Sequence, residues 1–123
     1  MDALTQTTLQ AIAGLNEAVN RHDLEATLAC MTKECVFENT YPPPDGERFV
    51  GQAALRRFWK EFFESSRLAH FEFEETFASG ERAFVRWQYR WESPDGAAGY
   101  IRGVDLFRVV DGKVAEKLSY VKG

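Results

Sequence analysis

Residues 103–114 read Gly-Val-Asp-Leu-Phe-Arg-Val-Val-Asp-Gly-Lys-Val, and this stretch predicts two antiparallel strands joined by a tight turn. The Asp111-Gly112 dipeptide supplies the turn, because two-residue hairpin loops need backbone conformations that Asp and Gly tolerate. Apolar residues dominate the strand before the turn, yet Asp105 interrupts them. A carboxylate is rarely buried without a partner, so Asp105 is the first candidate for a functional group.

The same alternation continues upstream of this hairpin and predicts two further strands. In residues 71–77 three Phe alternate with Glu and Thr, and residues 84–91 alternate again. A Ser-Gly turn separates these two strands, and a Ser-Pro-Asp-Gly turn separates the second from residues 100–110. With the returning strand at 114–121, the C-terminal half is predicted to form four antiparallel strands.

The N-terminal half has the spacing of helices. Apolar residues recur at helical intervals over residues 3–21, and Asp23 is a good N-cap for a shorter helix that carries Met31. A short strand at 35–38 precedes a third helix over 51–64. Helices followed by an antiparallel sheet predict one α+β domain over the whole chain of 123 residues.

Composition excludes several classes of function. The net charge is −4, and no Lys/Arg run is longer than Arg56-Arg57, so a nucleic-acid partner is not expected. No apolar stretch is long enough to span a membrane, and residues 1–5 lack a signal pattern, which predicts a cytoplasmic protein. Aromatic residues make up 14% of the chain, including ten Phe. A small core does not need so many rings, so some are expected to line a cavity or an interface.

The cysteines and histidines do not predict a metal site. Cys30 and Cys35 have no common zinc spacing with each other or with His22 and His70. Reduced thiols are therefore expected, and no metal or organic cofactor is implied, because the chain also lacks a phosphate-binding glycine loop.

Two further stretches join residues 103–114 in suggesting a family. Residues 20–28 read Asn-Arg-His-Asp-Leu-Glu-Ala-Thr-Leu, and residues 50–58 read Val-Gly-Gln-Ala-Ala-Leu-Arg-Arg-Phe. Together the three resemble the nuclear transport factor 2-like superfamily, and within it the SnoaL-like and ketosteroid isomerase-like branch. The resemblance implies a cone-shaped, curved sheet wrapped by three N-terminal helices around an apolar pocket. It also implies a homodimer that pairs through the convex face of the sheet.

Strand alternation and this resemblance together sort the side chains by face. We expect Asp105 to point into the pocket with Phe84, Arg86, Gln88 and Phe107. The opposite, convex face would then carry an aromatic patch suited to a dimer interface. Its predicted members are Trp87, Tyr89, Trp91, Leu118 and Tyr120. With the facing reversed, the Trp and Tyr rings of residues 84–91 would instead fill the cone.

The family's catalytic residues carry over only in part. Asp105 matches the pocket aspartate that acts as the acid/base group in SnoaL-like cyclases and that stays protonated in ketosteroid isomerases. Asn39 stands where the isomerases have a general base, and Leu15 stands where they have a tyrosine. In the epoxide hydrolase branch Asn39 and Arg86 match, whereas Gln88 and Ser119 replace the two aspartates.

In the expected register of these two strands, Arg86 is a cross-strand neighbour of Asp105. Its guanidinium would keep the carboxylate ionised, and Asp105 would then act either as a proton acceptor or as part of a structural ion pair. Asn39 and Arg86 would orient or polarise the ligand's oxygen. The remaining pocket candidates are ligand-binding residues, namely Tyr41, Phe58, Trp59, Phe62, Phe84, Gln88, Phe107 and Ser119.

The expected function is acid/base isomerase, cyclase or lyase chemistry on a small apolar molecule that carries a carbonyl. Two alternatives stay open: a non-catalytic binding protein of the same fold, and an epoxide hydrolase-like enzyme with an altered site.

Overall fold

Nine helices and strands form in the computed structural model, which describes residues 1–66 and 68–123. They are α1 (Ala3–Asn20), α2 (Leu24–Ala29), β1 (Met31–Glu38), β2 (Arg48–Val50), α3 (Gln52–Ser65), β3 (Ala69–Ser79), β4 (Arg82–Glu92), β5 (Ala98–Val110) and β6 (Lys113–Val121). The predicted α+β class, with helices at the N-terminal end, is confirmed.

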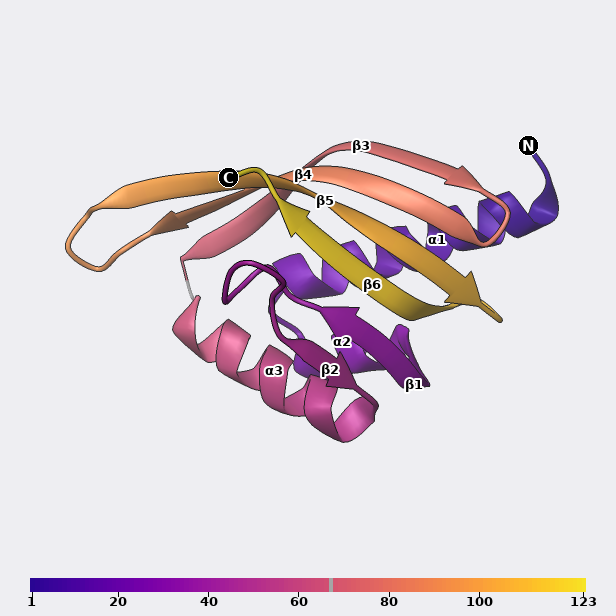
Figure 1. The fold of residues 1–123 in the computed structure, drawn as a ribbon, viewed down its shortest axis with the longest axis horizontal. Coiled ribbons are helices and arrows are strands. Elements are labelled where there is room, and N and C mark those ends of the chain that lie inside the picture. The colour runs from indigo at the N-terminus through magenta and orange to yellow at the C-terminus, as the bar shows by residue number, and fades with distance from the viewer. Residues whose placement is uncertain (67) are drawn as a thin grey trace.

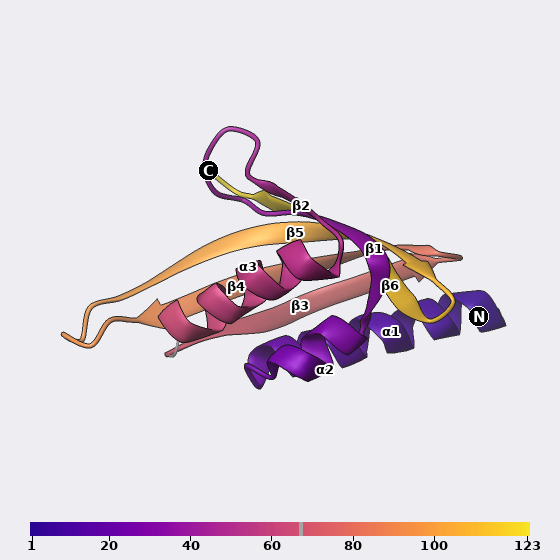
Figure 2. The ribbon, with the colours of Figure 1, turned by 90° about the horizontal axis from the view of Figure 1, so that it is seen from below.

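The strands form one curved sheet with the order β2-β1-β6-β5-β4-β3. Neighbouring strands are antiparallel except β1 and β6, which run parallel. The long β4–β5 hairpin extends past the end of α3 (Figure 1). The three helices lie along one side of the long strands (Figure 2), so the sheet has a covered inner face and an open outer face.

Local sequence explains the ends of these elements. The Asp2 carboxylate accepts the Thr5 N–H at 2.7 Å and caps α1, and the Asp23 carboxylate accepts the Ala26 N–H at 3.0 Å and caps α2. Asp111 and Gly112 form the predicted turn with φ angles of 51° and 75°. Two successive positive φ angles are what a type I′ hairpin turn requires.

Two details of the first half of the sheet differ from the expectation. Residue Met31 begins β1 rather than extending the second helix, because the Val114 N–H donates to the Cys30 carbonyl at 2.8 Å and draws the chain into the sheet. The three-residue β2 pairs with the end of β1 and was not expected. So short an edge strand has no alternation of its own to predict it.

The core lies between α1, α3 and the inner face of the sheet. Its fully buried side chains include Ile12 and Leu15 of α1, Leu55 of α3 and Phe107 of β5. Cys35 of β1 is buried with them, and burial raises the pKa of its thiol to about 12. Both cysteines are free. A thiol with so high a pKa stays protonated near neutral pH and acts as an apolar core group.

The predicted facing of β4 is wrong. Because Val85 pairs with Asp105 and Trp87 with Gly103, these β4 side chains share the inner face with Asp105. The physical reason is the missing side chain at Gly103, where a Cβ atom would lie 2.4 Å from Cζ2 of Trp87. The Trp87 ring occupies the space above that glycine.

Because the side chains of β4 face the opposite way from the expectation, the membership of the predicted convex patch changes too. Trp87, Tyr89 and Trp91 belong to the inner side, while Phe84, Arg86 and Gln88 lie on the outer side. The Arg86 guanidinium is half-exposed and lies 4.0 Å from the Glu75 carboxylate. Two members of the predicted patch, Leu118 and Tyr120, do lie on the outer face, since Leu118 pairs with Leu106 and Tyr120 with Val104.

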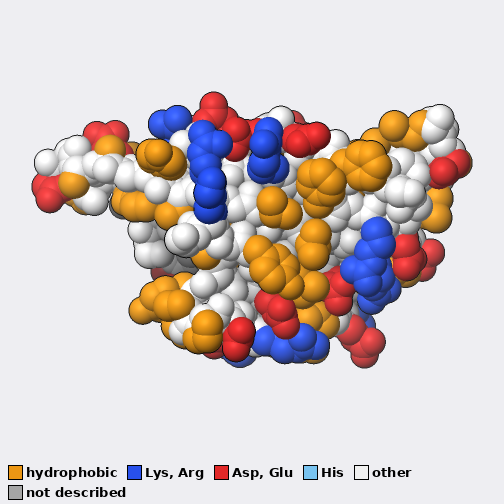
Figure 3. All heavy atoms as spheres, turned by 45° about the horizontal axis from the view of Figure 1, so that its top comes forward, with side chains coloured by type: hydrophobic (Ala, Val, Ile, Leu, Met, Phe, Trp, Pro, Cys, Tyr) orange, Lys and Arg blue, Asp and Glu red, His pale blue; other side chains and the backbone are white. Residues whose placement is uncertain are grey.

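A row of apolar side chains crosses the outer face instead. Phe77 of β3 pairs with Phe84 of β4, Phe84 with Leu106 of β5, and Leu106 with Leu118 of β6. We call these four residues the outer row. Figure 3 shows hydrophobic side chains gathered on this face between clusters of charged ones. Among the described residues, no helix is long and apolar enough to cross a membrane.

The contact between Trp87 and Gly103 gives a stability prediction. A Gly103→Ala substitution places a Cβ within 2.4 Å of both Trp87 and the Tyr120 carbonyl. We expect it to lower the free energy of unfolding by about 1–3 kcal/mol, as overpacking does. Urea denaturation measures this value. Gly14→Ala is the matched control, because the nearest atom is 3.9 Å away and alanine favours the helix. Unchanged stability in Gly103→Ala would contradict the packing described.

Candidate functional site

A cavity of about 270 Å³ opens between the inner face of the sheet and α3. The chain that leaves β1 covers one side of it, where the Asn39 N–H donates to the Glu47 carbonyl at 2.9 Å and closes the loop on itself. The cavity is lined by Phe37, Asn39, Thr40, Tyr41, Phe58, Trp59, Phe62, Ser66, Phe71, Trp87, Tyr89, Ile101, Asp105, Lys117 and Ser119. Its wall is therefore mostly aromatic, with few polar groups.

Three polar side chains of β5 and β6 meet at one place in this wall. The Lys117 ammonium lies 3.3 Å from Oδ2 of Asp105, and the Ser119 hydroxyl donates to Oδ1 of Asp105 at 2.6 Å. Lys117 also donates to Oγ of Ser119 at 3.1 Å. Ser119 pairs with Asp105 across the sheet, and Lys117 lies two residues earlier on the same face. Backbone register thus assembles the cluster.

The ion pair in this cluster is buried. Asp105 is 3% exposed and Lys117 is 7% exposed. Removing two charges from water costs several kcal/mol for each, and this cost is offset only when the charges are paired and hydrogen-bonded. Ser119 satisfies one oxygen of the carboxylate and one N–H of the ammonium. Nζ of Lys117 also lies 4.5 Å from the centre of the Phe37 ring and 5.8 Å from that of Trp59.

Aromatic residues from the helix and the sheet close the cavity around this pair. Phe62 of α3 lies 5.8 Å from Tyr89 between ring centres, and Phe71 of β3 packs edge-on against Trp87 at 5.5 Å. Burial raises the pKa of the Tyr89 phenol, and a hydrogen bond with Ser66 opposes that rise. Tyr89 therefore keeps its proton at neutral pH and can act as a hydrogen-bond donor.

Seven of the residues predicted for the site line the cavity. They are Asn39, Tyr41, Phe58, Trp59, Phe62, Asp105 and Ser119. Phe107 points to the same side of β5 but is fully buried in the core, outside the cavity wall. What these side chains do to a ligand stays a prediction.

Three predicted pocket residues do not reach the cavity. Phe84, Arg86 and Gln88 lie on the outer face, because their strand faces the other way. Arg86 pairs with Val104 rather than with Asp105, so the expected Arg86–Asp105 ion pair does not form. Lys117 takes that position.

Lys117 is the main functional candidate that the sequence interpretation missed. A signal for it is present, because strand alternation places residue 117 on the same face as Ser119, which the family resemblance predicts to be in the pocket. Trp87 and Tyr89, which fill the cone only under the reversed facing of β4, line the cavity.

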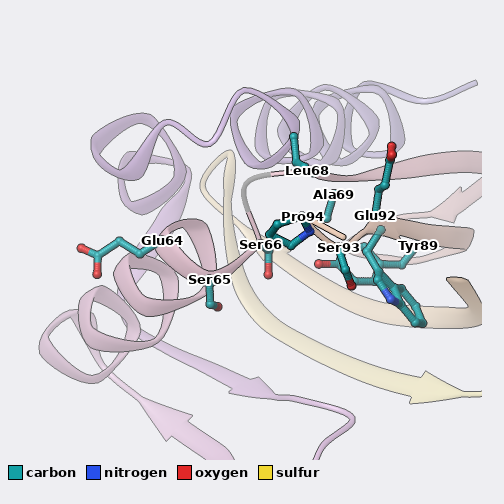
Figure 4. A pocket seen from close by; sticks show the side chains of 10 residues that line it. Glu64, Ser65, Ser66, Leu68, Ala69, Tyr89, Glu92, Ser93 and Pro94 are labelled. Atoms are coloured by element: carbon teal, nitrogen blue, oxygen red, sulfur yellow. The ribbon is translucent and has the colours of Figure 1, made fainter. Parts of the chain in front are cut away.

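A second, larger hollow of about 510 Å³ adjoins the cavity and shares Ser66 and Tyr89 with it. Figure 4 shows its side chains, with the carboxylates of Glu64 and Glu92 directed away from the ring of Pro94. Its described lining residues include no Lys, Arg or His. The smaller cavity is the better candidate site, since it holds a buried carboxylate beside a buried ammonium.

No metal site accompanies this cavity in the described part of the chain, where no three His, Cys, Asp or Glu side chains gather closely enough to hold an ion. The polar groups among the residues that line the cavity are a carboxylate, an ammonium, hydroxyls and an amide.

The buried pair makes a second stability prediction. Lys117→Met leaves the Asp105 carboxylate buried without its partner, and we expect a loss of about 3–5 kcal/mol in the free energy of unfolding. Lys117→Met combined with Asp105→Leu removes both charges and should recover most of that loss. Urea denaturation compares the variants. Lys60→Met is the control, because Lys60 is exposed and its carboxylate partner is 3.9 Å away. A double variant no more stable than the single one would contradict a desolvated pair.

Comparison with known proteins places the fold. The model of the SnoaL-like domain family matches residues 12–117. A solved structure of an NTF2-like protein of unknown function from Mesorhizobium loti is 37% identical, with a TM-score of 0.83, and the match covers 100% of this chain and 97% of the other. No curated protein matches the chain.

Two further solved structures hold organic molecules. A protein from Mycobacterium tuberculosis, in complex with estradiol-17beta-hemisuccinate, is 26% identical with a TM-score of 0.78, covering 93% of this chain and 92% of the other. TerC, co-crystallised with polyporic acid, is 17% identical with a TM-score of 0.80, covering 94% of this chain and 91% of the other. At 17% identity the likeness to TerC shows the fold alone. The family match spans most of the sequence, and the chain belongs to the SnoaL-like domain family.

Proposed function

We propose that this protein binds a small, largely apolar molecule with a carbonyl group and transfers a proton at the carbon next to that carbonyl. One observation carries the proposal: a buried Asp105–Lys117 pair in the wall of an aromatic cavity. Isomerase, cyclase and lyase reactions of carbonyl compounds share this proton transfer. The organic molecules held by the two structural neighbours support an apolar ligand for this fold.

Asp105 is the group that moves the proton. It is the single carboxylate among the described residues that line the cavity, and Asn39 cannot accept a proton at neutral pH. Ser119 holds Oδ1 of Asp105 and leaves Oδ2 beside the cavity and Lys117. A carboxylate fixed in one orientation reaches the substrate carbon without first losing rotational freedom.

Lys117 supplies the positive charge that this chemistry requires. Removal of a proton beside a carbonyl leaves an electron-rich intermediate, and a cation held in an apolar site stabilises it more than the same cation would in water. Asn39 and the protonated Tyr89 offer hydrogen bonds that orient the bound molecule. Arg86 cannot take this part, because it lies on the outer face.

Non-catalytic binding is the second candidate. Both oxygens of Asp105 already have partners, as they would in a purely structural ion pair. The epoxide hydrolase-like alternative is weaker. Arg86, which matches the arginine of that branch, and Gln88, which stands at one of its two aspartate positions, both lie outside the cavity.

Deuterium exchange separates catalysis from binding. We expect the protein to accelerate exchange at the carbon next to the carbonyl of 2-tetralone in heavy water, and Asp105→Asn to slow that exchange by roughly 100-fold or more, since general base catalysis contributes this much. Quenching of tryptophan fluorescence measures binding, which should change by less than about threefold, because the apolar cavity wall is intact.

Asp95→Asn is the matched control, because Asp95 is exposed in the β4–β5 turn and is not among the residues that line the cavity. Proton NMR follows the exchange. Full exchange in Asp105→Asn would contradict the role of Asp105, and binding without any exchange in the native protein would establish the binding alternative.

We also propose that the protein works as a cytoplasmic homodimer joined through the outer row and Tyr120. Phe77 is 58% exposed and Tyr120 is 56% exposed, and they extend one apolar surface across four strands. Soluble monomers rarely expose a contiguous apolar patch of this kind, and aromatic residues are enriched at interfaces. The free cysteines, Cys30 and Cys35, are consistent with a reducing compartment.

Light scattering tests the dimer. We expect native protein at twice the chain mass of 14.0 kDa, and Leu106→Lys at 14.0 kDa, because a charge in the middle of the outer row cannot be paired in the interface. Leu4→Lys is the control, since Leu4 is an exposed apolar residue on α1. A native monomer, or a dimer that survives Leu106→Lys, would refute the outer row as an interface.

A further inference from the structure

We propose that Lys117 is a covalent catalyst, which forms an imine with the carbonyl carbon of the bound molecule. The inference rests on the proposed function and narrows it, because an imine forms only with an aldehyde or a ketone. It specifies how Lys117 supplies its positive charge: as an iminium nitrogen bonded to the substrate rather than as a neighbouring ammonium.

The position of Nζ supports this role. Lys117 lines the cavity, so its amine can reach a bound carbonyl carbon. An ammonium has three N–H groups. Among the described residues, two acceptors lie close to Nζ: Oδ2 of Asp105 at 3.3 Å and Oγ of Ser119 at 3.1 Å. The third N–H is left for the oxygen of the ligand, which would bring the carbonyl carbon next to the nitrogen.

Asp105 is placed to activate this amine. The ammonium gives one proton to Oδ2 of Asp105, and the neutral nitrogen attacks the carbonyl carbon, so that a C–N bond forms while the carbonyl π bond opens. The oxygen takes up the proton from Asp105, and the nitrogen returns a proton to the carboxylate. A second proton transfer from Asp105 releases the oxygen as water. The net change is ammonium plus carbonyl to iminium plus water, with no oxidant or reductant.

The same two residues then perform the proposed proton transfer. The iminium draws electrons from the neighbouring carbon, and the Asp105 carboxylate, now ionised again, removes a proton from that carbon. Ser119 keeps the carboxylate in place by its hydrogen bond to Oδ1. A lysine in an apolar pocket beside a proton-transfer group is a recognised arrangement for Schiff-base chemistry.

The surroundings of Nζ favour the imine over its hydrolysis. The rings of Phe37 and Trp59 lie 4.5 Å and 5.8 Å from Nζ, and both residues are almost fully buried. An aromatic wall excludes the water that would reverse the reaction. With about 270 Å³ of space, the cavity is slightly smaller than the roughly 300 Å³ at which pockets for drug-sized ligands begin. The substrate class is thus a small, neutral, ring-bearing ketone or aldehyde.

Reductive trapping tests the covalent bond. Native protein is incubated with 2-tetralone and sodium cyanoborohydride, digested, and mapped by mass spectrometry. We expect the Lys117 peptide to gain the mass of the ketone less that of one oxygen atom. Its modified fraction should exceed that of Lys60 by roughly tenfold, because Lys117 lines a cavity that holds the ketone beside its amine, whereas Lys60, which also has a carboxylate neighbour, is exposed. Equal labelling of the two lysines, or no label on Lys117, overturns the proposal.

Lys117→Arg is the diagnostic variant, because it keeps a positive charge but cannot form an imine. We expect its rate of deuterium exchange on 2-tetralone to fall by roughly 100-fold or more, while binding of the ketone still quenches its tryptophan fluorescence. Exchange at the native rate in Lys117→Arg, with no adduct in the native protein, would overturn the covalent role and leave the proposed function standing.

The remaining outcomes separate the two proposals. An adduct on Lys117 without exchange supports the imine and removes the proton transfer, whereas the absence of both overturns both. Because the adduct is measured on the native chain, the proposal is tested even where Lys117→Arg fails to fold.

Discussion

The inner and outer faces of this protein depend on one steric constraint, the absence of a side chain at Gly103 beneath the indole of Trp87. A Cβ at this position would overlap the ring, so Trp87 can point inward only because its cross-strand partner is glycine. That contact fixes which way β4 faces. Once β4 is fixed, Trp87 and Tyr89 line the cavity and Arg86 is held outside.

The Asp105–Lys117 pair supplies the charged groups in the wall of this cavity. Replacing a buried ion pair with well-packed apolar residues is often neutral or stabilising, so such a pair is weak evidence for stability alone. Here the two charges lie on adjacent strands, joined through Ser119, and both border open volume. A pair that served packing only would not need to line a cavity. The proposed action on a ligand accounts for that position.

The sheet connects this site to the opposite surface. Period-two alternation means that every inward side chain of β5 has outward neighbours, so Asp105 lies between Val104 and Leu106 of the outer face. Leu106 belongs to the outer row, and its strand also carries the carboxylate of the site. Association of two copies across the outer row would therefore stiffen the strand that positions Asp105. The cavity and the proposed interface thus lie on opposite faces of the same strands.

The sequence was sufficient for the elements whose signal is local. Residues 103–114 predicted the hairpin and capping residues predicted the start of α2, while the family resemblance placed Asp105 and Ser119 in one pocket. The facing of β4 could not be predicted from local sequence, because both of its faces carry aromatic residues. Alternation shows which side chains share a face but does not show which face points toward the cavity. Lys117 became Asp105's partner through the β5–β6 register, which shifts between Arg108 and Val109, an irregularity that the hairpin sequence does not predict. Local patterns thus predicted the secondary structure and identified Asp105 as a candidate. Cross-strand packing against Gly103 decided which aromatic rings line the cavity, and the β5–β6 register decided that Lys117 is the cation beside Asp105.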